Sequence, residues 1–376
     1  MWNNLSGGQR RGTVSLGELD VTATLDLNRI LGWEGGNLFL YGLGTHGGSP
    51  TALSGDAQGV SNIEAPDAVR LYEAWYEQLL LEDRFSVLAG LYSLDTEFNV
   101  VRAAGFFLQS SHGTGATLGL SGKNGPSIFP YTSPGVRLKW IPRPRLAFQL
   151  AVLDGVPGAP GHPHGTHILI RPNDGALLAA EAAYLWLNGS GVTHGSRWIR
   201  RQHASRLTEV PYRDRVALGA WRYTGSFPDL TAVKGNGQPV QRTGSAGLYA
   251  QAEGQIFQEP ENPEQGLSVF AQIGFASGRV NRFTRYAGGG GVYQGIFPGR
   301  DEDQFGFSFA AAWNGEPYLE GQRRAEHAEV NLEWTYLASV TSWFDLQGDV
   351  QYVINPDTDP SLGNALLVAV RIMVAF

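Results

Sequence analysis

Two segments of this sequence place charged and aromatic side chains at every second position. Glu73, Trp75 and Glu77 alternate along one segment, and Arg137 and Lys139 alternate with apolar residues along another. Alternate side chains of an extended strand point to the same face, so each segment would present its polar groups together. Carboxylates, cations and an indole on one face offer hydrogen bonds and a flat apolar surface. This combination suits reversible binding of a polar solute.

Three histidines, His162, His164 and His167, lie close together in a Gly- and Pro-rich stretch. Their spacing would allow metal binding, but no carboxylate follows until Asp174. We therefore interpret the three as part of a solvated loop and expect no metal site.

The catalytic patterns of known enzymes are absent. The glycines within 42–47 match the sequence pattern of a dinucleotide-binding loop. This motif needs a helix after it, and Pro50 prevents one. The sequence has no nucleophile-elbow motif and no phosphate loop. Nothing places two acids across a cleft, as a glycosidase requires. We expect neither an enzyme nor a cofactor.

The clearest strand covers residues 328–340. Its even positions, from Ala328 to Val340, are apolar or aromatic, whereas the odd positions are mostly polar. Three residues then turn the chain into a second alternating segment, 344–354. This pattern predicts a hairpin with one apolar face and one polar face.

The same alternation recurs along the chain and predicts about fifteen strands. The final segment, 364–376, is apolar at even positions and ends on Phe376, an aromatic terminus that is common in bacterial outer-membrane barrels. The other segments are 13–27, 36–46, 69–79, 84–94, 135–141, 145–153, 177–187, 214–224, 245–257, 266–276, 286–297 and 303–313.

Composition favours a membrane barrel over a soluble sandwich. Aromatic residues gather near the turns, and the mean hydropathy of −0.18 fits strands that are polar on one side. No run of 18 apolar residues occurs, and there is no cysteine. The net charge of −7 gives no reason to expect nucleic acid as a partner. We predict an all-β fold, a transmembrane antiparallel β-barrel of the bacterial outer membrane, with residues 1–376 as its single domain.

Short turns alternate with long loops, as in outer-membrane barrels, with one exception. The connection 188–213 lies on the short-turn side but is long, and it carries four arginines: Arg197, Arg200, Arg201 and Arg206. This basic turn would point towards the periplasm. It supports an alternative function, in which the barrel exports a polysaccharide or docks periplasmic partners.

Single-chain bacterial barrels have an even number of strands, so the fifteen predicted strands imply that one further strand exists. Residues 1–12 are too few for a full strand of about 10 residues plus a loop. We expect sixteen strands in the full-length protein, with the first truncated here and 1–12 as its stub. No signal peptide opens the sequence, and we expect a gap or a strained, partial closure between the ends of the sheet.

Several stretches resemble the carbohydrate-selective outer-membrane porins of the OprB type. They occur in order along nearly the whole chain: LGWEGG at 31–36, GVSNIEAP at 59–66, RLYEAWYEQ at 70–78, DTEF at 95–98, TSPGVR at 132–137, PGRD at 298–301 and DVQYVINP at 349–356. The resemblance implies a sixteen-stranded barrel through which small sugars, mono- or oligosaccharides, diffuse across the outer membrane.

In such a pore, Glu73, Trp75 and Glu77 would line the constriction, with Arg137 and Lys139 opposite them. The two cations would complete a transverse field that favours polar neutral solutes. An alternative is that the two glutamates pair with arginines only to brace the wall.

The longest loop, 95–134, opens with Asp95, Glu97 and Arg102. We expect it either to fold inward and narrow the pore or to cap the outside. Outer-membrane lipid would surround the barrel, and Arg70 would reach the mouth or contact lipopolysaccharide.

Overall fold

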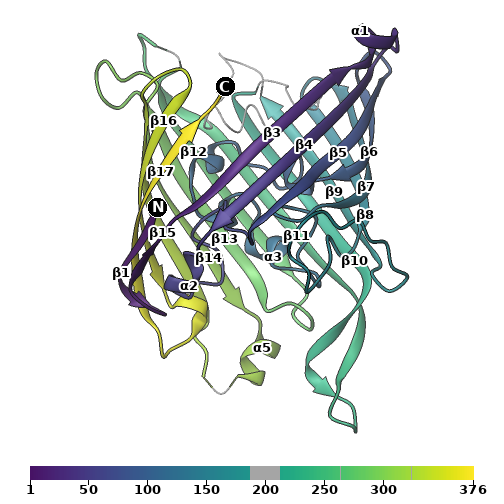
Figure 1. Cartoon of the computed structure of the whole chain (residues 1–376), viewed down its shortest axis with the longest axis vertical. Coiled ribbons are helices and arrows are strands. Elements are labelled where there is room, and N and C mark those ends of the chain that lie inside the picture. The colour runs from purple at the N-terminus through teal and green to yellow at the C-terminus, as the bar shows by residue number, and fades with distance from the viewer. Residues whose placement is uncertain (187–211, 263, 323) are drawn as a thin grey trace.

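The computed structural model describes residues 1–186, 212–262, 264–322 and 324–376, which form the antiparallel β-barrel of Figure 1. Its strands are β1 (Trp2–Gly8), β2 (Gly12–Val14), β3 (Leu16–Asp26), β4 (Gly36–Gly47), β5 (Ala68–Leu80), β6 (Phe85–Tyr92), β7 (Ser133–Arg143), β8 (Leu146–Asp154), β9 (Ala176–Trp186), β10 (Asp214–Val233), β11 (Pro239–Gln258), β12 (Gly266–Ala276), β13 (Phe283–Gln294), β14 (Gln304–Asn314), β15 (Ala328–Ser339), β16 (Phe344–Ile354) and β17 (Gly363–Val374). The α-helical turns in the described residues are α1 (Leu27–Leu31), α2 (Thr51–Ser54), α3 (Ala116–Gly119) and α5 (Glu316–Gly321). None of the described helices has the length and apolarity needed to cross a membrane.

The described sheet has seventeen strands, one more than expected, because one wall segment is divided. β2 and β3 follow each other with only Ser15 between them, and they occupy one position of the wall. Residues 1–12, expected to be a stub of the first strand and a loop, contain a strand that is shorter than a full spanning strand of about 10 residues. β1 forms a seven-residue strand that pairs with β17 on one side and with β2 on the other.

Closure of the wall at β1 is partial. The ladder between β1 and β17 begins at Trp2, opposite Ala369, and ends at Gly8, opposite Gly363. Within the described part of the chain, β3 is paired along one edge only, with β4. Figure 1 shows the N-terminus partway along the wall, beside β17. A gap or a partial closure between the ends of the sheet was expected, and the pairing of β1 with β17 and β2 is such a partial closure.

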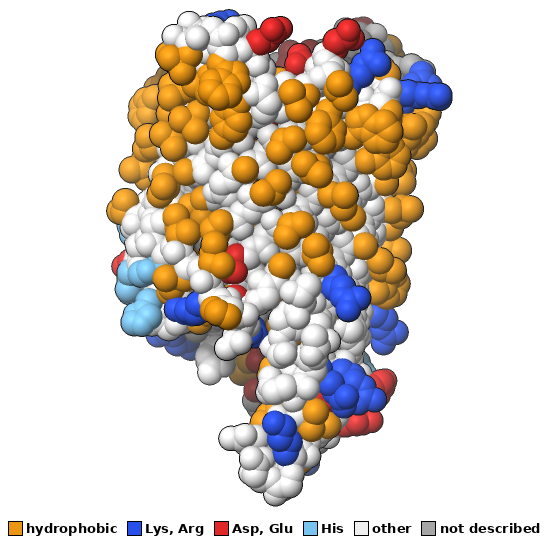
Figure 2. All heavy atoms as spheres, turned by 90° about the vertical axis from the view of Figure 1, so that its right-hand side faces the viewer, with side chains coloured by type: hydrophobic (Ala, Val, Ile, Leu, Met, Phe, Trp, Pro, Cys, Tyr) orange, Lys and Arg blue, Asp and Glu red, His pale blue; other side chains and the backbone are white. Residues whose placement is uncertain are grey.

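Alternation along the strands separates an apolar outer face from a polar inner face. On β15, Leu332 and Trp334 face outward, whereas Glu329 and Glu333 are fully buried inside. Figure 2 shows apolar side chains covering much of the outer wall. Lipid outside and polar groups inside require this period of two. The prediction that the even-numbered residues of 328–340 and of the C-terminal strand form the apolar face is confirmed.

Two long loops fold into the barrel. The loop after β6 carries buried Phe106 and Phe107, and these rings rest on Gly306 of β14. A Cβ at Gly306 would lie 2.6 Å from the ring of Phe106, so the close packing requires glycine at this position. The loop between β4 and β5 also turns inward, and the amides of Ala57 and Gln58 donate to Glu329. The interior is therefore narrowed by chain segments as well as by side chains.

One pair of strands extends well past the others. β10 and β11 have 20 residues each and continue the ladder from Asp214, opposite Gly254, to Val233, opposite Pro239. Both strands therefore extend well beyond the predicted segments 214–224 and 245–257. The hairpin projects from the end of the barrel that carries the long loops (Figure 1). Residues 188–211 of the basic connection, including the four arginines, are outside the described residues.

Candidate functional site

β5 turns Glu73, Trp75 and Glu77 to the inside of the wall, as expected. The indole Nε1 of Trp75 donates to Glu73 Oε2 at 3.1 Å, and the ring lies 4.9 Å from that of Phe39. Trp75 is only 4% exposed, so packing covers the ring face that we expected to stack on a solute. In this structure Trp75 belongs to the interior packing of the wall.

The face to which the odd-numbered side chains of β5 point changes at one irregular position. The register with β4 shifts so that Tyr41 faces Glu73 while the adjacent Gly42 faces Leu71. This bulge leaves Tyr72 as an extra residue, and residues on either side of it point the same way. Arg70 is consequently buried inside the barrel and donates to the carbonyl oxygens of Pro130 and Pro163. Arg70 was expected at the mouth or against lipopolysaccharide; in the structure it is buried among loop carbonyl groups at the long-loop end of β5.

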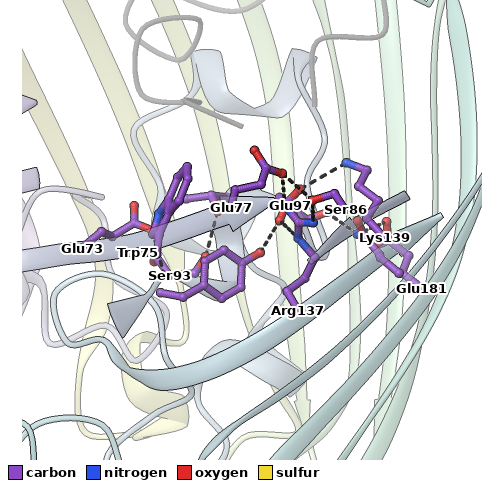
Figure 3. Close-up of polar contacts among 12 residues, drawn as sticks. Glu73, Trp75, Glu77, Ser86, Ser93, Glu97, Arg137, Lys139 and Glu181 are labelled. Carbon is purple, nitrogen blue, oxygen red and sulfur yellow. Dashed lines mark hydrogen bonds and ion pairs between the residues drawn. The ribbon is translucent and has the colours of Figure 1, made fainter. Parts of the chain in front are cut away.

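Arg137 lies at the centre of a buried ionic cluster (Figure 3). Its Nη2 is 2.9 Å from Glu77 Oε1, and its Nε is 2.6 Å from Glu97 Oε2. Lys139 Nζ is 3.2 Å from the other oxygen of Glu97. The cluster joins β5, β7 and the loop after β6, which is the geometry of a brace between wall and loop.

Glu97 is held in its charged form by this cluster. Burial alone would raise the pKa of its carboxyl, but Arg137 and Lys139 outweigh burial and lower the pKa to about 2. Asp95, two residues earlier, accepts a hydrogen bond from Ser93 Oγ at 2.6 Å, and burial raises the pKa of its carboxyl. Ser93 also donates its amide to Glu73, which ties Asp95 to the same end of the loop.

The long loop then crosses the interior, and glutamates of distant strands bind its backbone. The amides of the loop donate to three glutamates: Asn99 to Glu181 at 2.9 Å, Ala103 to Glu253 at 3.0 Å, and Leu108 and Gln109 to Glu333 at 2.6 and 3.1 Å. Each carboxylate accepts from buried backbone donors of the loop, and the amide of Asn99 also donates to the hydroxyl oxygen of Tyr249 at 3.2 Å. Of the two possibilities for 95–134, inward folding is confirmed.

Beside this loop is a cavity of about 80 Å³ at the short-turn half of the barrel. Three of the residues predicted for the site line it: Glu97, Arg102 and Lys139. Four that sequence reasoning missed also line it: Gln149, Glu181, Tyr212 and Arg215. Glu77 and Arg137 do not line this cavity, and neither do Glu73, Trp75 and Asp95.

Two contacts hold the lining residues that were not predicted from the sequence in place. Arg215 Nη2 is 2.5 Å from Glu181 Oε1, and the guanidinium of Arg102 lies over the ring of Tyr212 at 4.2 Å. Glu181 could have been found, because it is the one acid within the apolar segment 177–187. Tyr212 lies outside every alternating segment, so the pattern gave no signal for it.

The histidine-rich loop shows no metal geometry. His164 Nδ1 contacts the carbonyl oxygen of Asp67, and His167 Nε2 lies 2.7 Å from the carbonyl oxygen of His164. Across the described residues, no three His, Cys, Asp or Glu side chains come together in a way that could hold a metal ion.

Comparison with known proteins places this geometry among porins. Residues 10–376 match the model of the family described as carbohydrate-selective porin, OprB family. The chain is 22% identical to Porin B of Pseudomonas aeruginosa, over 94% of this chain and 80% of that protein. Among solved structures, it resembles the high-pH structure of Pseudomonas putida OprB, with a TM-score of 0.83 and 19% identity over 100% of this chain and 91% of that one. The outer membrane channel DcaP of Acinetobacter baumannii matches with a TM-score of 0.50 and 11% identity, over 91% of this chain and 84% of that one.

Proposed function

This chain belongs to the OprB family of carbohydrate-selective porins, and from that premise we propose that small sugars diffuse passively through its interior. As an outer-membrane β-barrel porin, it presents an apolar wall to lipid and a polar interior narrowed by two inward loops. The short turns lie at the periplasmic end and the long loops at the extracellular end. We propose that the chain acts as a channel and catalyses no reaction.

We propose that the 80 Å³ cavity lies on the sugar path. The observation that supports this most directly is the mixed chemistry of its lining, with carboxylates, guanidinium groups and the phenol ring of Tyr212. Sugar hydroxyls can donate to Glu97 and Glu181 and accept from Arg102 and Arg215. Opposite charges across a narrow path favour polar neutral solutes over ions of either sign.

Within this proposal, the predicted residues divide into two groups. Glu97, Arg102 and Lys139 contact the passing solute. A second group, Glu73, Trp75, Glu77, Asp95 and Arg137, supports the loop that narrows the path. This division is supported by the lining of the cavity, which includes the first group and none of the second.

Conductance in planar lipid bilayers tests the proposal. We expect the ionic current through the wild-type barrel to fall as glucose or maltose is added, because sugar in the path displaces conducting ions. Arg102→Gln should weaken this block about tenfold, since a hydrogen bond to a charged group is lost. Leu138→Gln changes the outward neighbour of Lys139 and should leave the block unchanged.

A wild-type current that does not respond to either sugar would contradict sugar diffusion. Equal sugar block in wild type and Arg102→Gln would instead remove the cavity from the path while leaving the diffusion proposal standing.

A further inference from the structure

A second concave surface lies on the outer wall, away from the sugar path. Across β7 to β11, the lipid-facing side is hollowed into a groove of about 740 Å³. Its floor is made of small residues, Ala180 and Ala182 of β9 and Ala220 of β10. Bulky residues line both sides, with Phe148 and Leu150 on one side and Leu218 and Leu248 on the other. Register explains the shape, because Phe148 pairs with Ala182 and Leu150 with Ala180.

The groove runs across the ladders, from Leu81 and Phe85 beside a short turn to Leu248. Further towards the periplasmic end of β9 lie Tyr184 and Trp186, whose rings are 4.6 Å apart, as in the aromatic girdle of an outer-membrane barrel. Trp186 pairs with Asp214, and Arg222 follows on the same strand. At ~3.3 Å per residue, about 25 Å of strand separates Asp214 from Arg222. With a strand tilt of about 40°, this distance matches most of an apolar band about 25 Å tall.

Arg222 therefore lies at the extracellular edge of the band, two positions beyond Ala220 on the outer face of β10. It is exposed, and its neighbours across the ladders are Leu178 and Ala246. Within the described residues, no carboxylate forms an ion pair with Arg222. At this edge the exposed guanidinium lies at the level of the lipid headgroups, where an anionic phosphate can pair with it.

Two further cations lie near the same edge. Lys123 donates to the carbonyl oxygen of Asn173 at 2.9 Å, and Arg171 begins the turn that leads into β9. The nearest acid of that turn, Asp174, is buried and accepts the amide of Arg171. Figure 2 shows Lys and Arg side chains where the apolar covering ends, above the projecting hairpin.

We propose that this groove binds lipopolysaccharide, the phosphorylated glycolipid of the outer leaflet. An acyl chain lies along the alanine floor, and a headgroup phosphate accepts hydrogen bonds from the guanidinium of Arg222. The charge decides between lipid and protein as occupant. A second copy of this chain would have to cover Arg222 with its own apolar wall, whereas a phosphate supplies the missing negative charge.

Native mass spectrometry of the delipidated full chain in detergent tests this site. The probes are Kdo2-lipid A, which carries phosphates, and phosphatidylethanolamine as the competitor lipid. We expect preferential binding of Kdo2-lipid A to wild type. Arg222→Gln should weaken that binding about tenfold, since a charge-assisted contact is lost. Arg222→Lys keeps the charge and should retain part of the affinity.

Ala220→Phe should also weaken binding, because the new ring fills the floor of the groove. Matched controls lie outside the groove. Arg285→Gln removes an outward arginine of β13, and Ala271→Phe adds a ring to the outer face of β12. Both controls should bind Kdo2-lipid A like wild type. The heat-dependent gel migration of each variant reports that its barrel is folded.

Three results would overturn the proposal. The first is equal affinity of wild type for the two lipids. The second is an equal loss of binding in Arg222→Gln and its control Arg285→Gln. The third is a dimer or trimer that Ala220→Phe dissociates, which would show that a second copy of the chain occupies the groove.

Discussion

Arg137 compensates the negative charge of two buried glutamates in the interior. It pairs with both Glu77 and Glu97, and all three side chains are almost fully buried. Arg137→Met would leave Glu77 without this cation and leave Glu97 with Lys139. Breaking a buried pair by removing one partner costs about 3–5 kcal/mol. We expect a loss of that size in the free energy of unfolding, measured by urea titration of the barrel in lipid vesicles with tryptophan fluorescence.

Leu138→Met is the control for Arg137→Met, because it changes the adjacent outward residue. Combining Arg137→Met with Glu77→Gln should recover part of the loss, since one of the uncompensated charges is removed as well. A loss for Arg137→Met no larger than that for Leu138→Met would show that the cluster does not brace the loop.

His112, in the inward loop, is a second residue with a clear prediction. Burial lowers the pKa of its imidazole to about 3, and the ring packs 5.3 Å from Phe107 and 5.7 Å from Phe270. Between about pH 6.5 and pH 3 the unfolded chain binds a proton here that the folded chain does not. Stability from the neutral imidazole is therefore complete above pH 6.5 and is lost as pH falls towards 3.

The measurement is the midpoint of thermal unfolding in detergent across this pH range. His112→Gln can still bond to Ser308 Oγ, which lies 2.9 Å from His112 Nε2. The variant should show a smaller fall in midpoint between pH 6.5 and 3 than wild type. Identical slopes would mean that the imidazole is not held neutral by the loop.

At the scale of elements, the depth of an outward residue should set the cost of charging it. Leu332 faces lipid near the middle of β15, and Ala338 faces outward near its periplasmic end. An arginine costs about 2–4 kcal/mol at the midplane of a barrel wall and about 0–1 kcal/mol near the interface. Urea unfolding should therefore separate Leu332→Arg from Ala338→Arg. Equal losses at the two positions would contradict the membrane placement of the strand.

Alternation predicted the wall because lipid and interior impose opposite polarity on neighbouring residues. It located 328–340 and 344–354, which the structure gives as β15 and β16. It failed for the outer halves of β10 and β11, where Thr224 and Ser226 face outward beyond the apolar band. It also gave no sign that Arg70 points inward, because a bulge at Tyr72 reverses the face to which the side chains of β5 point and the composition carries no signal of it.

The candidate site was harder to predict than the wall because contacts distant in sequence build it. The amide of Leu108 binds Glu333, and that of Ala103 binds Glu253. Nothing in the local pattern of either segment specifies its partner. The sequence therefore marked Glu97, Arg102 and Lys139 as polar groups of the interior but gave no means of joining them to Arg215 or Tyr212.

At the scale of the whole molecule, partial closure of the wall predicts uneven hydrogen exchange along β17. Val370 N–H donates to the carbonyl oxygen of Met1 at 2.9 Å, and Val368 faces Asn3 within the ladder to β1. Backbone groups alternate along a strand, so the amide of Ile372 points to the same side as those of Val368 and Val370. Beyond Met1, no described strand accepts it.

An unpaired amide at the level of the lipid costs several kcal/mol. Its proton exchanges readily with solvent deuterium because no hydrogen bond protects it. We therefore expect the Ile372 amide to exchange much faster than that of Val368, which NMR of the barrel in lipid nanodiscs can resolve. Met373, whose amide points towards β16, is the internal control and should exchange slowly. Equal protection of Ile372 and Val368 would mean that β3 and β17 close against each other in the membrane.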